Sequence, residues 1–226
     1  MLACTVLGIT IERIAYKPLR GASSLSVLIT AIGVSYFLQN SALLIFGADS
    51  KTFTSLVSFP PVKLMGGSVV ISSVTIVTIL TSIVIMIALT TFINKTRTGQ
   101  AMLAVSADKG AATLMGIDVN RTIAITFAIG SSLAAIAGIL LCSAYPALSS
   151  TTGAMPGIKA FTAAVFGGIG SIPGAMIGGL VMGIIENLSK AYISSQLADA
   201  IVFGVLIVVL LVKPTGLMGK KIQEKV

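Results

Sequence analysis

The sequence lacks the residues on which most catalytic and metal sites depend. It contains no histidine and only two cysteines, Cys4 and Cys142, each inside an apolar run. A Ser-His-Asp triad, a zinc site and a disulfide framework therefore lack the residues that they require. The nucleotide-binding pattern Gly-x-x-x-x-Gly-Lys-Ser/Thr is absent as well. We predict that the chain is not an enzyme, that it holds no metal or cofactor, and that any ATP binds to another protein.

Charged residues are also scarce. Only 10% of the 226 residues are charged, 55% are hydrophobic, and the mean hydropathy is +1.04. This composition does not suit a water-exposed surface, and it predicts a multi-pass membrane protein. We expect an all-α bundle, because an open sheet edge in lipid leaves backbone groups unsatisfied. The net charge of +8 comes from Lys and Arg placed between apolar blocks, so these residues favour topology and lipid-headgroup roles over nucleic-acid binding.

Apolar runs divide the chain into about six crossings within a single transmembrane domain, 1–226. Residues 1–11 are fewer than the roughly 20 that a crossing needs. We expect this run to end in a basic loop at Glu12, with earlier helices missing from the chain, or to form a short helix whose Arg13 side chain reaches the membrane surface. Pro60-Pro61 excludes a continuous helix in the following connection, 47–67. The predicted crossings are 24–46, 69–93, 123–141, 157–172, 175–193 and 197–212.

The basic residues between the crossings predict which ends face the cytoplasm. Cytoplasmic loops carry an excess of Lys and Arg. If 157–172 is a crossing, all the basic segments lie on the cytoplasmic side. If 157–174 is a re-entrant hairpin, the C-terminal lysines would lie outside, so we favour a broken crossing. The residues expected inside are Arg13, Lys17, Arg20, Lys95, Arg97, Lys109, Arg121, Lys220, Lys221 and Lys225.

The only long polar connection between strongly apolar blocks is 95–121, which we predict to be a cytoplasmic docking loop. Ala101, Val105, Ala112 and Met115 recur at roughly helical spacing and could form one apolar stripe. Gly116 is suited to end a short helix. The stripe fits either a helix on the lipid surface or a helix bound in a groove of a soluble partner.

Polar residues inside predicted crossings are candidates for a substrate path. Gln39 and Asn40 are costly facing lipid, so they should either bond to other helices or line a wet path. Glu186 and Asn187 lie on another crossing. Lys190 is placed to form an i,i+4 ion pair with Glu186, and this pair competes with a substrate-contact role.

Glycines recur at four-residue spacing near Pro173. Such spacing lets a neighbouring helix approach closely, so static packing is one interpretation. A hinge is the other, because Pro173 and the glycines beside it would free the backbone for bending. The residues in question are Gly170, Pro173, Gly174, Gly178, Gly179 and Gly183.

Several motifs in a fixed order resemble one family, the branched-chain amino acid ABC transporter permeases, of the subtype found as one of two unlike permease subunits. The resemblance covers nearly the whole chain. The motifs are Ala-Tyr-Lys-Pro-Leu-Arg at 15–20, Leu-Ile-Thr-Ala-Ile-Gly-Val-Ser-Tyr-Phe-Leu-Gln-Asn at 28–40, Thr-Gly-Gln-Ala-Met at 98–102, Leu-Met-Gly-Ile at 114–117, Gly-Gly-Ile-Gly-Ser-Ile-Pro-Gly-Ala-Met at 167–176 and Pro-Thr-Gly-Leu at 214–217.

The resemblance implies import of Leu, Ile or Val across the cell inner membrane. It implies a second permease subunit, two ATP-binding subunits that hold ATP and Mg, and an extracytoplasmic substrate-binding protein. It also implies that 108–117 includes the helix that couples to the ATPase. The coupling residues would be Asp108, Ala111, Ala112, Leu114, Met115 and Gly116.

Three alternatives remain. A permease of the same ABC group could carry urea, short amides or other amino acids. A secondary carrier could use Glu186 to couple an ion or proton. Family members usually carry additional helices before the position of Met1, so the chain could also be a shortened, inactive assembly subunit.

Overall fold

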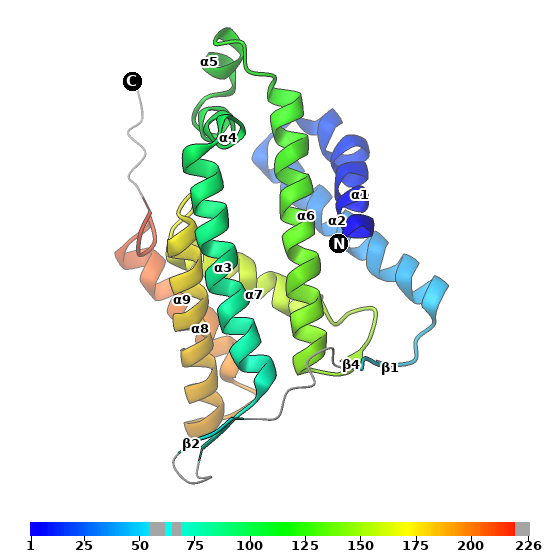
Figure 1. Cartoon of the computed structure of the whole chain (residues 1–226), viewed down its shortest axis with the longest axis vertical. Coiled ribbons are helices and arrows are strands. Elements are labelled where there is room, and N and C mark those ends of the chain that lie inside the picture. Colours follow the sequence, from blue (N-terminus) through cyan, green and yellow to red (C-terminus); the bar gives the residue numbers. More distant parts are fainter. Residues whose placement is uncertain (55–61, 65–68, 220–226) are drawn as a thin grey trace. The chain divides into compact units, whose positions relative to one another are not determined.

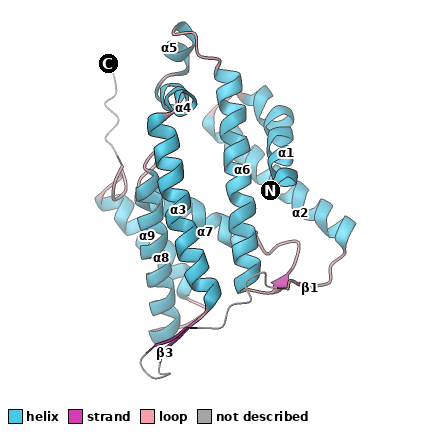
Figure 2. Ribbon diagram, in the orientation of Figure 1, coloured by secondary structure: helices cyan, strands magenta, loops and turns pink. Residues whose placement is uncertain are grey.

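A computed structural model describes residues 1–54, 62–64 and 69–219, which are predominantly helical (Figures 1 and 2). The all-α transmembrane class predicted from composition is confirmed. The α-helices are Leu2–Ile11 (α1), Ser24–Phe46 (α2), Ser73–Lys95 (α3), Arg97–Ala107 (α4), Lys109–Leu114 (α5), Val119–Ala144 (α6), Ala154–Gly167 (α7), Ile172–Tyr192 (α8) and Ala198–Val212 (α9).

Four helices in the described part of the chain, α2, α3, α6 and α8, are long and apolar enough to cross a membrane. They carry large apolar side chains on their outer faces, such as Leu44 at 86% exposure and Phe37 at 70%. In water such continuous apolar surfaces would cause association, whereas in a bilayer they contact lipid. Helices α7 and α9 have 14 and 15 residues, which makes them about 21–23 Å long, shorter than the roughly 30 Å hydrocarbon core.

In residues 1–54, 62–64 and 69–219, two short antiparallel ribbons accompany the helices. Strand β1 (Lys51–Thr52) pairs with β4 (Ala147–Leu148), and Lys51 lies opposite Leu148. Strand β2 (Val62–Leu64) pairs with β3 (Val69–Ile71), with Val62 opposite Ile71.

The second ribbon corrects one predicted boundary. We expected a helix from residue 69, but α3 begins at Ser73, after Ser72 in an extended conformation. The β-branched residues of β3 instead pair with β2, which satisfies their backbone groups before the helix begins. The predicted break at Pro60-Pro61 lies outside the described residues.

The described chain divides into two compact units, and the first comprises residues 1–84 and 91–152. In this unit α1 packs along α6. A Cβ added at Gly8 would overlap Ser131, so glycine permits this close contact. Further along, the Tyr16 and Phe127 rings lie 5.0 Å apart between centroids.

Helix α1 ends at Ile11, as expected, but the basic loop predicted after it is wrong. The helical path continues as a π-helix, Glu12–Tyr16 (η1), and a 3-10 turn, Lys17–Leu19 (η2). Glu12 is only 3% exposed and forms an ion pair with Arg20. A buried carboxylate needs such a partner, and the pair fixes the turn that leads into α2.

The second unit comprises residues 85–90 and those from 153 on, and it contains α7, α8 and α9. Phe166, Met182 and Val202, one from each helix, form its buried core. Glycines allow α7 and α8 to approach backbone to backbone: a Cβ at Gly174 would overlap Gly167, and one at Gly178 would overlap Ala163. The close approach therefore depends on the absence of a side chain at these positions.

Pro173 lies in the first turn of α8, not in the middle of a bent helix. Gly168 and Gly170 take positive φ angles in the turn before it, and the Ser171 hydroxyl accepts a hydrogen bond from Gly174 N at 3.1 Å. Proline costs nothing in a first turn, because its missing N–H would have no partner within the helix. The expected broken segment is therefore two helices joined by a tight turn.

The segment after α9 returns to this turn. Leu217 N donates to Phe166 O and Met218 N donates to Gly167 O, both at 2.9 Å. The end of α7, the start of α8 and the end of α9 thus lie together, and α8 runs antiparallel to the other two. Residues 157–174 do not form a hairpin by themselves, because the helix that follows the turn, α8, continues to Tyr192 and is long enough to span a membrane.

The glycine contacts generate the first prediction. Gly178→Ala should destabilise the protein by about 1–3 kcal/mol, because the methyl group must force α7 and α8 apart. Gly183→Ala is the matched control on the same helix, since a Cβ there meets no atom within 4 Å. The measurement is the thermal unfolding midpoint of the purified protein in detergent. Equal midpoints for the two variants would contradict the packing argument.

Candidate functional site

The polar connection 95–121 contains α4 and α5, and side-chain caps define its helix starts. Thr96 Oγ1 accepts from Gly99 N at 3.0 Å at the start of α4. Asp108 Oδ1 accepts from Gly110 N at 2.7 Å at the start of α5, and Asp118 Oδ1 accepts from an amide in the first turn of α6. Each cap supplies an acceptor to a first-turn amide that has no partner within its helix.

The single apolar stripe predicted along this connection is wrong. Asp108 is extended, with φ −156° and ψ 114°, so α4 and α5 are separate helices without a common face. Val105 and Ala112 are buried at 7% and 3% exposure, whereas Met115 is 81% exposed. Ala101 is half-buried. Of the predicted coupling residues, Ala112 therefore faces the interior of the loop.

Helix α5 ends at a glycine, as expected from the sequence. Gly116 has φ +78°, its N–H donates to Thr113 O, and Ile117 N donates to Ala112 O, both at 3.0 Å. These two bonds close the helix end. They leave Leu114 at 90% and Met115 at 81% exposure at the end of a six-residue helix. We call these two side chains the apolar tip.

Three of the four predicted substrate-path residues hydrogen-bond within their own helices. Gln39 Nε2 donates to Ser35 Oγ at 3.1 Å, and Asn40 Nδ2 donates to Tyr36 O at 2.8 Å. Asn187 Nδ2 donates to Gly183 O at 2.9 Å. None of these three bonds joins two helices, and the fourth candidate, Glu186, behaves differently.

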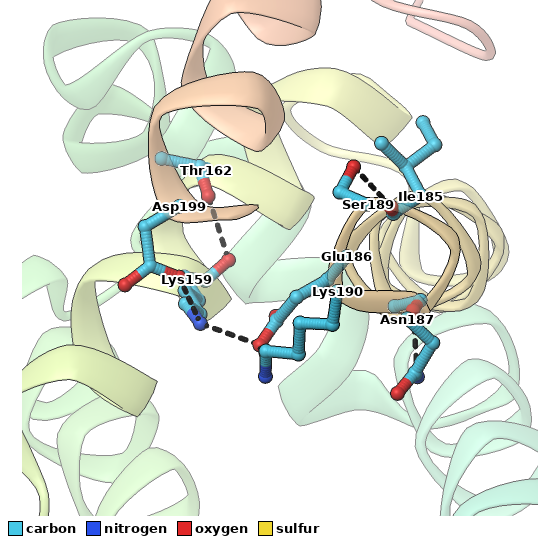
Figure 3. A network of polar contacts seen from close by, with 9 residues as sticks. Lys159, Thr162, Ile185, Glu186, Asn187, Ser189, Lys190 and Asp199 are labelled. Carbon is cyan, nitrogen blue, oxygen red and sulfur yellow. Dashed lines mark hydrogen bonds and ion pairs between the residues drawn. The ribbon is translucent and has the colours of Figure 1, made fainter. Parts of the chain in front are cut away.

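Glu186 belongs to a four-charge cluster, defined as Lys159, Glu186, Lys190 and Asp199 (Figure 3). Lys159 Nζ, from α7, lies 2.9 Å from Glu186 Oε1 on α8 and 2.7 Å from Asp199 Oδ1 on α9. Lys190 Nζ lies 2.5 Å from the same Glu186 oxygen. The pair of Glu186 with Lys190 was expected from their spacing. Lys159 links all three helices of the unit.

Sequence reasoning missed Lys159 and Asp199. Each is a charged residue inside a predicted crossing, and a charge there requires a partner. A charged side chain within a crossing is costly unless it is paired. The two cations and two anions of the cluster cancel, which lowers that cost.

The cluster lies toward one end of its unit. Lys190 is in the last turn of α8 and Asp199 is in the first turn of α9, at the opposite end of both helices from Gly168 and Leu217. Side-chain exposures are 26% for Lys159, 19% for Glu186, 43% for Lys190 and 41% for Asp199. In the part of the chain that the structure describes, no group of three or more His, Cys, Asp or Glu residues could hold a metal ion.

The cluster generates the second prediction. Lys159→Met should lower the unfolding midpoint more than Lys190→Met, by an amount equivalent to about 1–2 kcal/mol. Removing Lys159 leaves Asp199 without a cation, whereas removing Lys190 leaves Glu186 paired with Lys159. Detergent-solubilised protein can be compared by thermal unfolding. A larger loss in Lys190→Met would show that the shared cation does not hold the three helices together.

Comparison with known proteins places this chain in a family. Residues 1–211 match the family described as "Branched-chain amino acid transport system / permease component". The high-affinity branched-chain amino acid permease protein LivH of Salmonella typhimurium is 45% identical over 230 residues, covering 100% of this chain and 74% of the relative. LivH of Escherichia coli K12 is 47% identical over 223 residues, covering 97% and 72%. BraD of Pseudomonas aeruginosa is 44% identical over 230 residues, covering 100% and 74%.

No solved structure matches the chain. The family match covers nearly all of the sequence, and the relatives carry the name of a transport permease rather than of an enzyme. The four span-length apolar helices among the described residues fit a multi-pass membrane protein. The chain therefore belongs to the branched-chain amino acid transport permease family.

Proposed function

We propose that this chain is a membrane-spanning subunit of an ATP-driven ABC importer that moves branched-chain amino acids inward across the cell membrane. The observation that supports this most strongly is the 45–47% identity, over essentially the whole chain, to proteins named as high-affinity branched-chain amino acid permeases. The same identity favours these substrates over urea or short amides.

The proposed importer needs partners, because the sequence has no phosphate-binding loop. In this proposal a second permease subunit completes the pathway and an extracytoplasmic binding protein delivers the substrate. Two ATP-binding subunits carry ATP and Mg on the cytoplasmic side. This chain binds neither nucleotide nor metal; it converts movement of the ATPase into movement of its helices.

The connection 95–121 is the proposed coupling element. The apolar tip, Leu114 and Met115, would insert into a groove on the ATPase, in the manner of an amphipathic helix bound in a groove. Asp108 and Gly116 would fix the two ends of α5, Ala111 would contact the partner, and Ala112 would support the helix from inside. Both α4 and α5 contact α6, so a push on the tip would reach α6 directly and α3 through the chain.

In this scheme the direction of transport depends on how tightly each access state binds the substrate and the binding protein. ATP binding closes the ATPase dimer, and the importer alternates between two access states whose affinities for substrate and binding protein differ. Gln39, Asn40, Glu186 and Asn187 remain candidates for the substrate path. A secondary carrier using Glu186 is less favoured, because a coupling ion would have to displace two ammonium groups already bonded to that carboxylate.

Reconstitution of the complete importer in liposomes tests the proposal. With the binding protein outside and ATP inside, labelled leucine should accumulate, and unlabelled isoleucine and valine should compete while urea should not. An uncoupler should leave uptake intact, and ATP depletion should stop it. Uptake that needs an ion gradient and not ATP would favour the secondary carrier.

The apolar tip generates the third prediction. Leu114→Asp and Met115→Asp should each weaken ATPase association by about tenfold or more, since charged groups would enter a desolvated contact. Leu103→Asp is the matched control, because Leu103 is an exposed leucine of the same connection, on α4. The readout is copurification of the ATPase with membrane-inserted permease. Full copurification with both tip variants would reject the coupling role.

A further inference from the structure

The ion pairs of the four-charge cluster form an unbranched series in which anions and cations alternate. Three links join Asp199 Oδ1, Lys159 Nζ, Glu186 Oε1 and Lys190 Nζ in that order (Figure 3). One end is therefore an anion, on α9, and the other end is a cation, on α8. Each end has one charged partner among the residues that the structure describes.

The two end groups are also the accessible ones. Asp199 and Lys190 are 41% and 43% exposed, whereas the inner Lys159 and Glu186 are 26% and 19% exposed. Within the described residues, the second Asp199 oxygen, Oδ2, takes part in none of the cluster's ion pairs, and Lys190 contacts a single carboxylate oxygen. Each end can therefore bind a further group of opposite charge without losing its present partner.

The spacing of the ends suits one small molecule. Asp199 Oδ1 and Lys190 Nζ are no more than about 8 Å apart, because the three links measure 2.7, 2.9 and 2.5 Å. Charge-assisted hydrogen bonds are about 2.7–2.9 Å long. Two such bonds, together with the short separation of ammonium and carboxylate across one carbon, span a similar distance. An α-amino acid could therefore close the series into a ring, with its ammonium on Asp199 and its carboxylate on Lys190.

The connection between the two end residues carries exposed apolar side chains. The connection from α8 to α9 runs between Lys190 and Asp199, and its Ile193 and Leu197 are 65% and 54% exposed. These aliphatic side chains can cover the branched side chain of a bound leucine, isoleucine or valine. An ionic pair of ends beside exposed aliphatic residues matches the two halves of such a substrate.

We propose that the four-charge cluster is a receiving site for the zwitterionic head of an α-amino acid, with Asp199 and Lys190 as the contact residues and Lys159 and Glu186 as positioning residues. This inference rests on the proposed import function and deepens it. The cluster lies at the end of α8 opposite the segment that leads to the C-terminal lysines. With those lysines inside, the site faces the side from which the binding protein releases its substrate.

Direct binding to the purified complex, without the binding protein, tests the site. Equilibrium dialysis with labelled leucine should show saturable binding to wild-type permease assembled with its second subunit and ATPases. Unlabelled leucine should compete. Leucinamide, which lacks the carboxylate, and 4-methylpentanoate, which lacks the ammonium, should each compete at least about tenfold more weakly, because each loses one charge-assisted hydrogen bond.

Two end variants and two controls give the second arm. Asp199→Asn and Lys190→Gln each remove one charge and leave the Lys159–Glu186 pair in place, and each should weaken leucine binding by about tenfold. Asp49→Asn and Lys51→Gln remove the same charges from exposed residues after α2, and their binding should stay within about twofold of wild type. All four should elute as intact complexes.

The outcomes separate this inference from the import function. No saturable binding to the wild-type complex, equal competition by either analogue, or wild-type binding by both end variants would overturn the receiving site. The analogue competition decides the question even if an end variant fails to assemble. If the same wild-type complex then imports leucine with ATP and binding protein, only the receiving site is wrong. If it imports no branched-chain amino acid, the function itself is wrong and the inference falls with it.

Discussion

In hydrocarbon, every charge and every backbone polar group needs a partner inside the protein, because no water is there to supply one. The second unit meets this requirement at both ends. Lys159 joins carboxylates of α8 and α9 at one end, and backbone bonds from the segment after α9 close the turn between α7 and α8 at the other. Because Gly174 and Gly178 bring α7 and α8 together between these points, the three helices are held along their common length.

Local patterns made part of this arrangement predictable. The apolar runs predicted the span-length helices, and the four-residue spacing predicted that Glu186 would pair with Lys190. The partners of Lys159 were not predictable in the same way, since they lie 27 and 40 positions along the chain and meet only when three helices have packed. A charge in a crossing shows that a partner is needed, but the helix arrangement decides which one.

At two boundaries that sequence reasoning missed, backbone N–H groups find partners outside a continuous helix. Periodicity assumes one continuous helix, and a short polar side chain that accepts backbone N–H bonds ends that continuity. Asp108 does so between α4 and α5, which rotates Met115 outward while Ala112 stays inside. Backbone pairing acts similarly at β3, where Val69–Ile71 form a ribbon in place of the first helical turn.

The break at Asp108 also distinguishes between the two roles considered for the connection 95–121, binding to the lipid surface and binding in a groove of a protein partner. A helix that lies on lipid needs a long apolar face, because its affinity grows with buried apolar area. The break at Asp108 removes that face and leaves Leu114 and Met115 as the exposed large apolar side chains at the end of α5, while the charged Asp108 and Lys109 lie exposed at its start. Two such side chains, fully buried, supply about 3–6 kcal/mol, which is little for holding a loop on a membrane. In a preformed groove they need no long apolar face, and the flanking charges stay in water, so the geometry favours a protein partner over the lipid surface.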